Sequence, residues 1–161
     1  MSLILSGNRL AGTIPECLSA FANLQLLQLF NNSLTGTLPP FGQLSKLTKL
    51  DVRYNQLTGT LDAMFDSTLA LDQTSTTSSS SSALSIVRLD RNEFTGTIPT
   101  LPGAATVLTK VTLLGTNLTG TVPFCDATEY PAISVVEVDC PEVNCTCCSN
   151  CDVIWCFSGD C

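Results

Sequence analysis

A block of eight residues recurs five times in this chain of 161 residues, and it limits the fold more than any other feature. The blocks are NRLAGTIP, NSLTGTLP, NQLTGTLD, NEFTGTIP and TNLTGTVP, at residues 8–15, 32–39, 55–62, 92–99 and 116–123. Their glycines are separated by 24, 23, 37 and 24 residues. This spacing is typical of a solenoid, in which one repeat cannot bury its own apolar face but a stack buries a continuous core.

Apolar residues alternate just upstream of each block, which predicts a short strand with one face towards the core. The alternating sets are Leu24/Leu27/Leu29, Leu47/Leu50/Val52, Leu84/Val87/Leu89 and Leu108/Val111/Leu113, with partial sets at Leu3/Leu5 and Ile133/Val136/Val138. An asparagine after the strand can turn the chain and satisfy backbone groups of neighbouring coils. We therefore expect Asn8, Asn32, Asn55 and Asn92 to form a buried polar ladder, which Thr116 interrupts.

The unit L-x-x-L-x-L-x-x-N-x-L-x-G-x-I-P resembles the plant-specific class of leucine-rich repeats, found in receptor-like kinases, receptor-like proteins and polygalacturonase inhibitors. The resemblance covers residues 3–140. It implies an α/β solenoid: a leucine-rich-repeat right-handed superhelix with a parallel β-sheet on the concave face and short 3₁₀ or α segments on the convex face. It also implies a second short strand at each L-T-G-T. We assign residues 1–139 to this solenoid, with about five to six coils.

The longest interval between repeats contains a Ser/Thr-rich tract at residues 67–82. Such tracts bury little surface and stay solvated. Because the repeat resumes in register at Leu84, we predict a loop on the convex side of the solenoid. An O-glycosylated segment is the alternative.

Nine cysteines favour an oxidising environment. Cys17 stands alone, whereas Cys125, Cys140, Cys145, Cys147, Cys148, Cys151, Cys156 and Cys161 crowd the end of the chain. We predict a disulfide-bonded C-terminal cap over residues 140–161. Cys125 and Cys140 flank the last strand and are the first expected pair. The tail CPEVNCTCCSNC resembles the cysteine-rich end of secreted leucine-rich-repeat proteins of diatoms and related algae.

A zinc site is the competing interpretation of the cap, since Cys148-x-x-Cys151 has the spacing of zinc ligands. The chain has no histidine, and it carries N-glycosylation sequons at Asn31, Asn117 and Asn144. These features favour bridges over zinc, so we expect no metal and no cofactor.

Composition excludes several functions. Without histidine, Ser-His and Cys-His nucleophiles are unavailable, so we expect no enzyme. The net charge of −7 disfavours nucleic acid as a partner. No run approaches the roughly 20 apolar residues of a membrane span, and we expect no leader before the first repeat. We expect an extracellular or cell-surface protein whose membrane attachment, if any, lies in segments absent from this chain.

Outward positions on the concave strands are the candidate ligand-binding residues. They are Gln28, Phe30, Asp51, Arg53, Tyr54, Arg88, Asp90 and Arg91. Register places Asp51 beside Arg88 and Arg53 beside Asp90, which gives a reciprocal cluster of four charges. The cluster either neutralises the sheet or, with the aromatic residues, binds a ligand. We predict a receptor-like or inhibitor-like recognition module for a protein, peptide or glycan.

Threonines in the L-T-G-T blocks offer an alternative surface. Two outward columns are expected at Thr35/Thr37, Thr58/Thr60, Thr95/Thr97 and Thr119/Thr121. Threonine suits any exposed strand. A regular column could also match an ice lattice, so a structural, ice-associated or cell-wall-associated protein is the alternative function.

The chain begins inside a repeat, without a polar capping segment. We therefore expect Leu3, Leu5, Leu10 and Ile14 to be exposed at an open strand edge. The chain would then be a fragment of a longer array, or it would self-associate through this edge.

Overall fold

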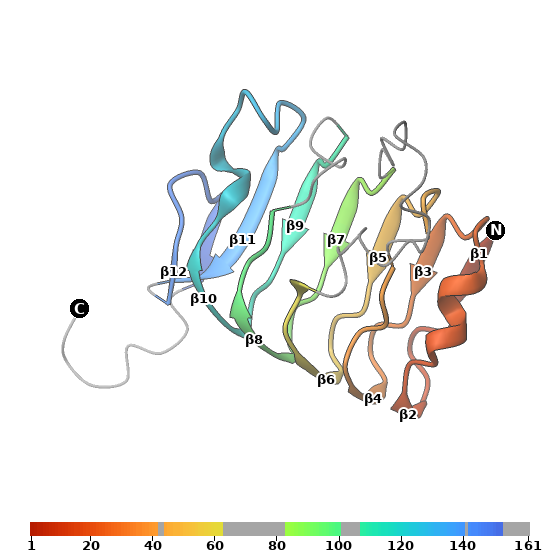
Figure 1. The fold of residues 1–161 in the computed structure, drawn as a ribbon. Coiled ribbons are helices and arrows are strands. Elements are labelled where there is room, and N and C mark those ends of the chain that lie inside the picture. The colour runs from red at the N-terminus through yellow and green to blue at the C-terminus, as the bar shows by residue number, and fades with distance from the viewer. Residues whose placement is uncertain (42–43, 63–82, 101–106, 141, 153–161) are drawn as a thin grey trace, which may run out of the picture.

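The computed structural model describes residues 1–41, 44–62, 83–100, 107–140 and 142–152, which form a solenoid of two parallel sheets (Figure 1). One sheet has seven strands in the order β1-β3-β5-β7-β9-β11-β13. The other has six strands in the order β12-β10-β8-β6-β4-β2. Each coil therefore adds one strand to each sheet, and the predicted solenoid with a parallel concave sheet is confirmed.

The strands up to residue 139 fall where the alternation and the L-T-G-T blocks predict them, and two further strands lie in the predicted cap. The concave sheet contains β1 (Ser2–Ile4), β3 (Leu26–Gln28), β5 (Lys49–Asp51), β7 (Ile86–Arg88), β9 (Lys110–Thr112), β11 (Val135–Asp139) and β13 (Asn150–Asp152). The second sheet contains β2 (Ala11–Thr13), β4 (Ser33–Gly36), β6 (Gln56–Gly59), β8 (Glu93–Thr97), β10 (Asn117–Thr121) and β12 (Val143–Asn144). Two 3₁₀ helices, η1 (Glu16–Ala20) and η3 (Pro123–Cys125), lie between strands.

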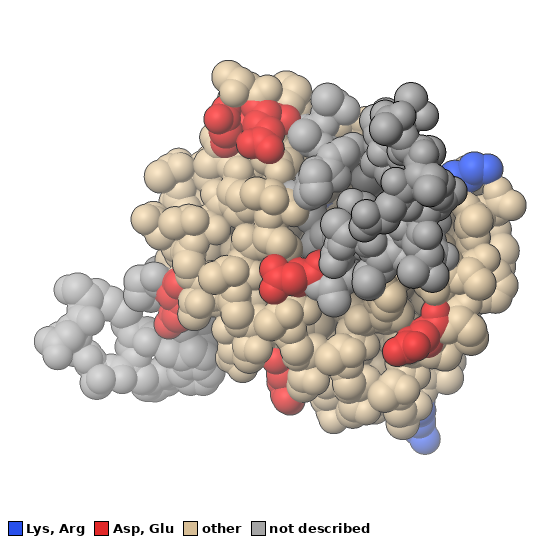
Figure 2. Space-filling view, viewed as in Figure 1, with Lys and Arg blue, Asp and Glu red and all other residues tan. Residues whose placement is uncertain are grey.

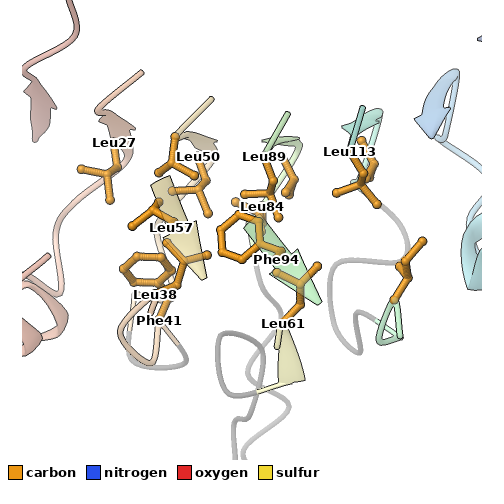
Figure 3. Close-up of a cluster of buried hydrophobic side chains, with 14 of the residues drawn as sticks. Leu27, Leu38, Phe41, Leu50, Leu57, Leu61, Leu84, Leu89, Phe94 and Leu113 are labelled. Carbon is orange, nitrogen blue, oxygen red and sulfur yellow. The ribbon is translucent and has the colours of Figure 1, made fainter. Parts of the chain in front are cut away.

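The core runs between the two sheets along the stack of coils, from Ile14 to Val143. Figure 3 shows a cluster of its side chains in the middle coils. Leu27 and Leu50 of the concave sheet and Leu57 of the second sheet have no exposed surface. Phe94 fills the same position in β8 and is also fully buried. Burial of each such side chain contributes about 1.5–3 kcal/mol, so the repeat pattern itself drives the stacking.

The asparagine ladder joins the coils through polar contacts. The Asn92 amide nitrogen donates to the carbonyl oxygens of Leu89 at 2.9 Å, of Val52 at 3.1 Å and of Asp90 at 3.2 Å. Its oxygen accepts the N–H of Leu57 at 3.1 Å. Each such side chain thus connects two coils and both sheets.

The ladder is buried only in the central coils. Asn55 and Asn92 are buried, Asn32 is half-buried and Asn8 is exposed. Asn8 donates to Leu5 and Ser6 of its own coil, because in this structure no coil stacks on that side. The prediction of a buried Asn8 was therefore wrong.

Exposure at the first coil is smaller than expected. Leu5 and Leu10 are exposed and Leu3 is half-buried. Ile14 is only 5% exposed, which corrects the prediction that it faces water. It joins the core cluster together with Leu18 of η1, whose helix follows directly in the chain.

Two predicted segments lie outside the described residues. The Ser/Thr-rich tract at 67–82 is one, and residues 153–161 of the predicted cap are the other. Within the predicted cap, β12 and β13 extend both sheets past residue 139. The boundary between the solenoid and the cap stays a prediction.

We predict that Asn92→Ala destabilises the fold by at least about 2 kcal/mol, because it leaves the buried N–H of Leu57 and three carbonyl oxygens without this partner. Asn8→Ala is the matched control and should cost less than about 1 kcal/mol, since its contacts are exposed. Urea unfolding followed by circular dichroism measures both. Equal losses for the two variants would contradict the coupling role of the buried asparagine.

Candidate ligand-binding site on the concave sheet

A hollow of about 310 Å³ lies on the concave sheet. Its walls are formed by Arg53, Tyr54, Arg88, Asp90, Arg91, Lys110, Thr112, Leu114 and Glu137. Five of the eight predicted binding residues are among them. Of the other three, Asp51 is fully buried, while Gln28 and Phe30 are half-buried outside the hollow.

The predicted charge cluster forms around Asp51, but its strongest contact lies within one coil. Arg53 donates to Asp51 from Nε at 2.8 Å and from Nη2 at 3.0 Å. Arg88 is in register with Asp51, yet its Nη1 lies 3.8 Å from the carboxylate. Residues two apart point to the same side of an extended chain, so Arg53 reaches Asp51 in a bidentate pair that excludes closer contact with Arg88. The hydrogen bond to Asp51 raises the pKa of Arg53.

Asp90 serves mainly to join two coils. Its carboxylate accepts the Thr112 hydroxyl at 2.5 Å and the Leu114 N–H at 2.9 Å. Arg53 Nε lies farther away, at 3.9 Å. Burial raises the pKa of Asp90, and the bonds from Thr112 and Leu114 oppose that shift. The carboxylate is therefore committed to the next coil, and little of it is free for a ligand.

Phe30 supports the cluster from the preceding coil. The guanidinium carbon of Arg53 lies 5.5 Å from the centre of the Phe30 ring, in a cation–π contact. The ring is half-buried, so it orients Arg53 and offers only part of its surface to a ligand.

Tyr54 and Arg91 are the exposed side chains of the hollow, and both have an unusual backbone. Their φ angles are 54° and 55°, in the left-handed region that non-glycine residues seldom adopt. The same repeat position holds Gly7, Asn31 and Gly115 in other coils, also with positive φ. Sequence reasoning missed this feature, although the recurrence of Gly and Asn before the ladder position was a signal for it.

Lys110 and Glu137 close the hollow on its far side. Lys110 Nζ lies 3.5 Å from Glu137 Oε1 across neighbouring strands β9 and β11. Lys110 was not among the predicted residues. It precedes the inward-facing Val111, and that alternation was the available signal.

The cysteines of the cap pair differently from our expectation. Disulfides join Cys125 to Cys147 and Cys145 to Cys148, so the predicted Cys125–Cys140 pair is wrong. The reason is that β12 pairs with β10, which carries the chain after Val143 back towards η3 and Cys125. Cys140 is also disulfide-bonded, and Cys17 is a free, exposed thiol.

The remaining predicted residues have these positions. Cys151 lies in β13, and Cys156 and Cys161 lie outside the described residues. The sequon residues Asn31, Asn117 and Asn144 are exposed, and their glycosylation stays a prediction.

Comparisons with known proteins agree with this architecture. The Leucine Rich Repeat family profile matches residues 1–21, 23–44 and 46–67. The chain is 32% identical over 135 residues to Receptor-like protein 41 of Arabidopsis thaliana, a match that covers 75% of this chain and 15% of that protein. The plant peptide hormone receptor RGFR1, solved in complex with RGF2, is 26% identical with a TM-score of 0.66, over 89% of this chain and 20% of that one. A plant ice-binding protein is 28% identical with a TM-score of 0.61, over 89% of this chain and 42% of that one.

The chain belongs to the leucine-rich-repeat proteins. Within them it is a relative of the plant receptor-like proteins, and it spans about 15% of the length of Receptor-like protein 41. These relatives are a receptor-like protein and a plant peptide hormone receptor. Within the described residues, no helix has the length and apolar character that a bilayer crossing requires. The resemblance of the tail to diatom proteins stays a prediction.

We predict that Asp90→Asn changes the pH dependence of stability. Because the folded pKa of Asp90 is raised above its ordinary value of 3.8, the folded state keeps the proton to higher pH than the unfolded state does. The contribution of Asp90 to stability therefore falls as the pH rises from its unfolded pKa to its folded pKa. The difference in unfolding free energy, variant minus native chain, should therefore increase as the pH rises from below 3.8 to well above it. A difference that stays constant over this range would contradict the shift; thermal unfolding at stepped pH measures it.

Proposed function

We propose that this chain is the ligand-recognition part of an extracellular or cell-surface receptor-like protein, and that it binds a peptide, or a peptide segment of a protein, in the concave hollow. One observation carries the proposal: exposed aromatic and arginine side chains, Tyr54 and Arg91, border one hollow on a rigid parallel sheet. Aromatic and arginine residues are the side chains that contribute most often to binding energy at protein interfaces.

The relatives support a peptide over a glycan. RGFR1 is described as a peptide hormone receptor, and its solved complex contains RGF2. The hollow lies over the middle strands of a seven-stranded sheet, so an extended segment can continue across neighbouring coils in both directions. Such a segment would contact several outward positions at once, each on a fixed strand.

The test is selection of peptides from a random library displayed on phage, with the folded chain as the target. We expect the selected peptides to bind the Tyr54→Gly variant at least about tenfold more weakly than the native chain. The reason is that this change removes an aromatic contact worth about 1.4 kcal/mol or more. Glycine suits the positive φ of this position, so the fold should persist.

Thr35→Ala is the matched control, since Thr35 is exposed on the second sheet, outside the hollow. Peptides that bind Tyr54→Gly as well as the native chain would place recognition elsewhere. Failure to select any peptide, together with binding of wall oligosaccharides, would favour a glycan receptor.

An ice-associated function is a second candidate, because the threonine column is regular in space. The glycines of the second sheet lie against threonine methyl groups of the preceding coil. A Cβ on Gly36 would be 2.8 Å from the methyl carbon of Thr13, and a Cβ on Gly59 would be 2.8 Å from that of Thr37. For Gly96 and Thr60 the distance would be 3.1 Å. Each of these methyl groups thus packs over the glycine of the next coil. The offset between coils is constant, since the backbone register pairs Thr13 with Thr35 and Thr35 with Gln56, two residues before the equivalent threonine. The similarity to a plant ice-binding protein also supports this candidate.

For this candidate we predict thermal hysteresis by the native chain that is lost in the double variant Thr37→Tyr, Thr60→Tyr, because the larger rings interrupt the column. Tyr54→Gly is the control on the other sheet and should keep full activity. Absence of hysteresis in the native chain would exclude the candidate.

A further inference from the structure

Two disulfide bonds near the C-terminal end of the solenoid lie against each other. One joins Cys125 of η3 to Cys147, and the other joins Cys145 to Cys148. The Sγ atoms of Cys125 and Cys145 belong to different bonds, yet they are only 3.8 Å apart. Atoms at this distance are in contact, so the two bonds form one group of four sulfur atoms.

The four cysteines of this group differ in their exposure. Cys125, Cys145 and Cys148 are half-buried and pack against the core cluster, whereas Cys147 is exposed. Exchange between a thiol and a disulfide requires that a thiolate reach a sulfur atom, so access decides where a reductant enters. An external thiol therefore reaches Cys147 first.

The charge around the two bonds selects the kind of reductant. From residue 111 to residue 161 the sequence has seven acidic residues and no Lys or Arg. The face seen in Figure 2 agrees, since acidic groups are scattered over it and basic groups show only near the N-terminal coils. Negative charge repels anionic thiols such as glutathione, so an uncharged dithiol is the better-suited reductant.

Attack of a dithiol on Cys147 starts a defined sequence of exchanges. The dithiol's thiolate bonds to Cys147 Sγ, and the electron pair of the broken bond leaves on Cys125 Sγ. The second thiol of the reductant then displaces Cys147 as a thiol, so the dithiol is oxidised to a disulfide and the protein gains two electrons and two protons. The Cys125 sulfur set free in this way is the one that lies 3.8 Å from Cys145.

The freed Cys125 thiolate is placed to open the second bond. It attacks Cys145 Sγ, a Cys125–Cys145 bond forms, and Cys148 leaves as a thiolate that takes up a proton. This step needs no further oxidant or reductant, since one disulfide replaces another. If the dithiol opens Cys145–Cys148 first, the Cys145 thiolate attacks Cys125 instead and releases Cys147. Both routes end in the same product.

The arrangement of the sulfur atoms explains why the exchange waits for reduction. A thiolate attacks along the axis of the bond that it breaks. The sulfurs of Cys125, Cys145 and Cys147 all lie within 4.8 Å of one another, so they form a compact triangle and not a line. A sulfur atom therefore reaches the line of attack only after its own bond has opened and its side chain can turn.

Burial favours the exchanged product. It joins Cys125 to Cys145, which are both half-buried, and places one of its two thiols on the exposed Cys147. If the Cys125–Cys147 bond were retained, both thiols would lie on half-buried residues, where a polar group is less well solvated. The exchanged bond also closes a loop between residues 20 apart, whereas Cys145–Cys148 joins residues only 3 apart. The longer loop restricts the unfolded chain more.

We propose that these two bonds are one thiol–disulfide exchange site, whose two-electron-reduced form carries a Cys125–Cys145 bond and thiols on Cys147 and Cys148. In this form the covalent link to η3 moves from Cys147 to the residue that directly follows β12. The end of β12 stays linked to the solenoid while the segment before β13 is released. The site is thus a redox switch for the last concave strand, and it does not depend on what the hollow binds.

The test maps the bonds of the native chain after partial reduction. The free thiol of Cys17 is first blocked with iodoacetamide. One equivalent of dithiothreitol is then added in the presence of a chelator, acid stops the reaction, and thiols are labelled with N-ethylmaleimide. Proteolysis and tandem mass spectrometry locate the labels. Among chains with two labels on the four cysteines of the site, we expect labels on Cys147 and Cys148 in at least about tenfold excess over any other pair.

Two double variants, each with two cysteines of the site, are the matched controls. Cys147→Ser, Cys148→Ser keeps only the pair that the exchange joins, so it should form the Cys125–Cys145 bond and melt within about 4 °C of the native chain. Cys145→Ser, Cys148→Ser keeps the Cys125–Cys147 bond without a second bond to exchange with. Its reduction should label both remaining cysteines of the site together and leave no cross-link between them.

Hydrogen exchange on the partially reduced native chain follows the consequence for the fold. The Ser149 amide donates to the Val136 carbonyl at 2.8 Å, and the Val122 amide donates to the Asn144 carbonyl at 3.1 Å. We expect Ser149 to lose protection, because it lies in the released segment before β13. Val122 should keep its protection, because its partner in β12 directly precedes the new bond.

Three results would overturn the inference. The first is a pair of labels on Cys145 and Cys148 with the Cys125–Cys147 bond intact, and the second is a pair on Cys125 and Cys147 with the other bond intact. Either would mean that the two bonds are reduced independently. The third is a Cys147→Ser, Cys148→Ser chain whose two remaining thiols stay unpaired under oxidising conditions that form the bond in Cys145→Ser, Cys148→Ser.

Discussion

The asparagine that follows each concave strand couples the coils of this solenoid. Asn92 donates to carbonyl groups of its own coil and of the previous one, and it accepts the Leu57 N–H from the second sheet. Leucine burial drives the stacking, but it is nearly indifferent to small rotations between coils. The asparagine contacts have defined directions, so they fix the angle at which each coil meets the next.

That fixed geometry explains how residues distant in sequence form one site. Arg53 and Glu137 are far apart in the chain, yet both border the hollow because their coils are stacked in a constant register. The turn that delivers the ladder asparagine requires a positive φ at the residue before it. Tyr54 and Arg91 occupy that residue in adjacent coils, so the same turn that builds the ladder also projects the two exposed side chains of the site.

The sequence predicted the strands up to residue 139, their inward faces and five of the residues that line the hollow, because strand alternation and repeat spacing specify direction and register. It did not predict which charges would pair. From the sequence, either Arg53 or Arg88 can pair with Asp51. The structure shows that Arg53 makes the bidentate contact and that Arg88 lies farther away. The cysteine pairing was missed for a similar reason: Cys147 reaches Cys125 only because β12 joins the second sheet, and a two-residue strand leaves no clear pattern.

Pairing within the sheet occupies most of the charged cluster. Asp51 and Arg53 neutralise each other, and Asp90 is bound to the next coil through Thr112 and Leu114. These contacts occupy the acidic groups of the middle coils, so they cannot also neutralise Arg91. Structural pairing therefore leaves Arg91, among the described residues that line the hollow, without an ion-pair partner. A variant such as Arg53→Ala would release Asp51 to pair with Arg88, which is in register with it and lies 3.8 Å from its carboxylate.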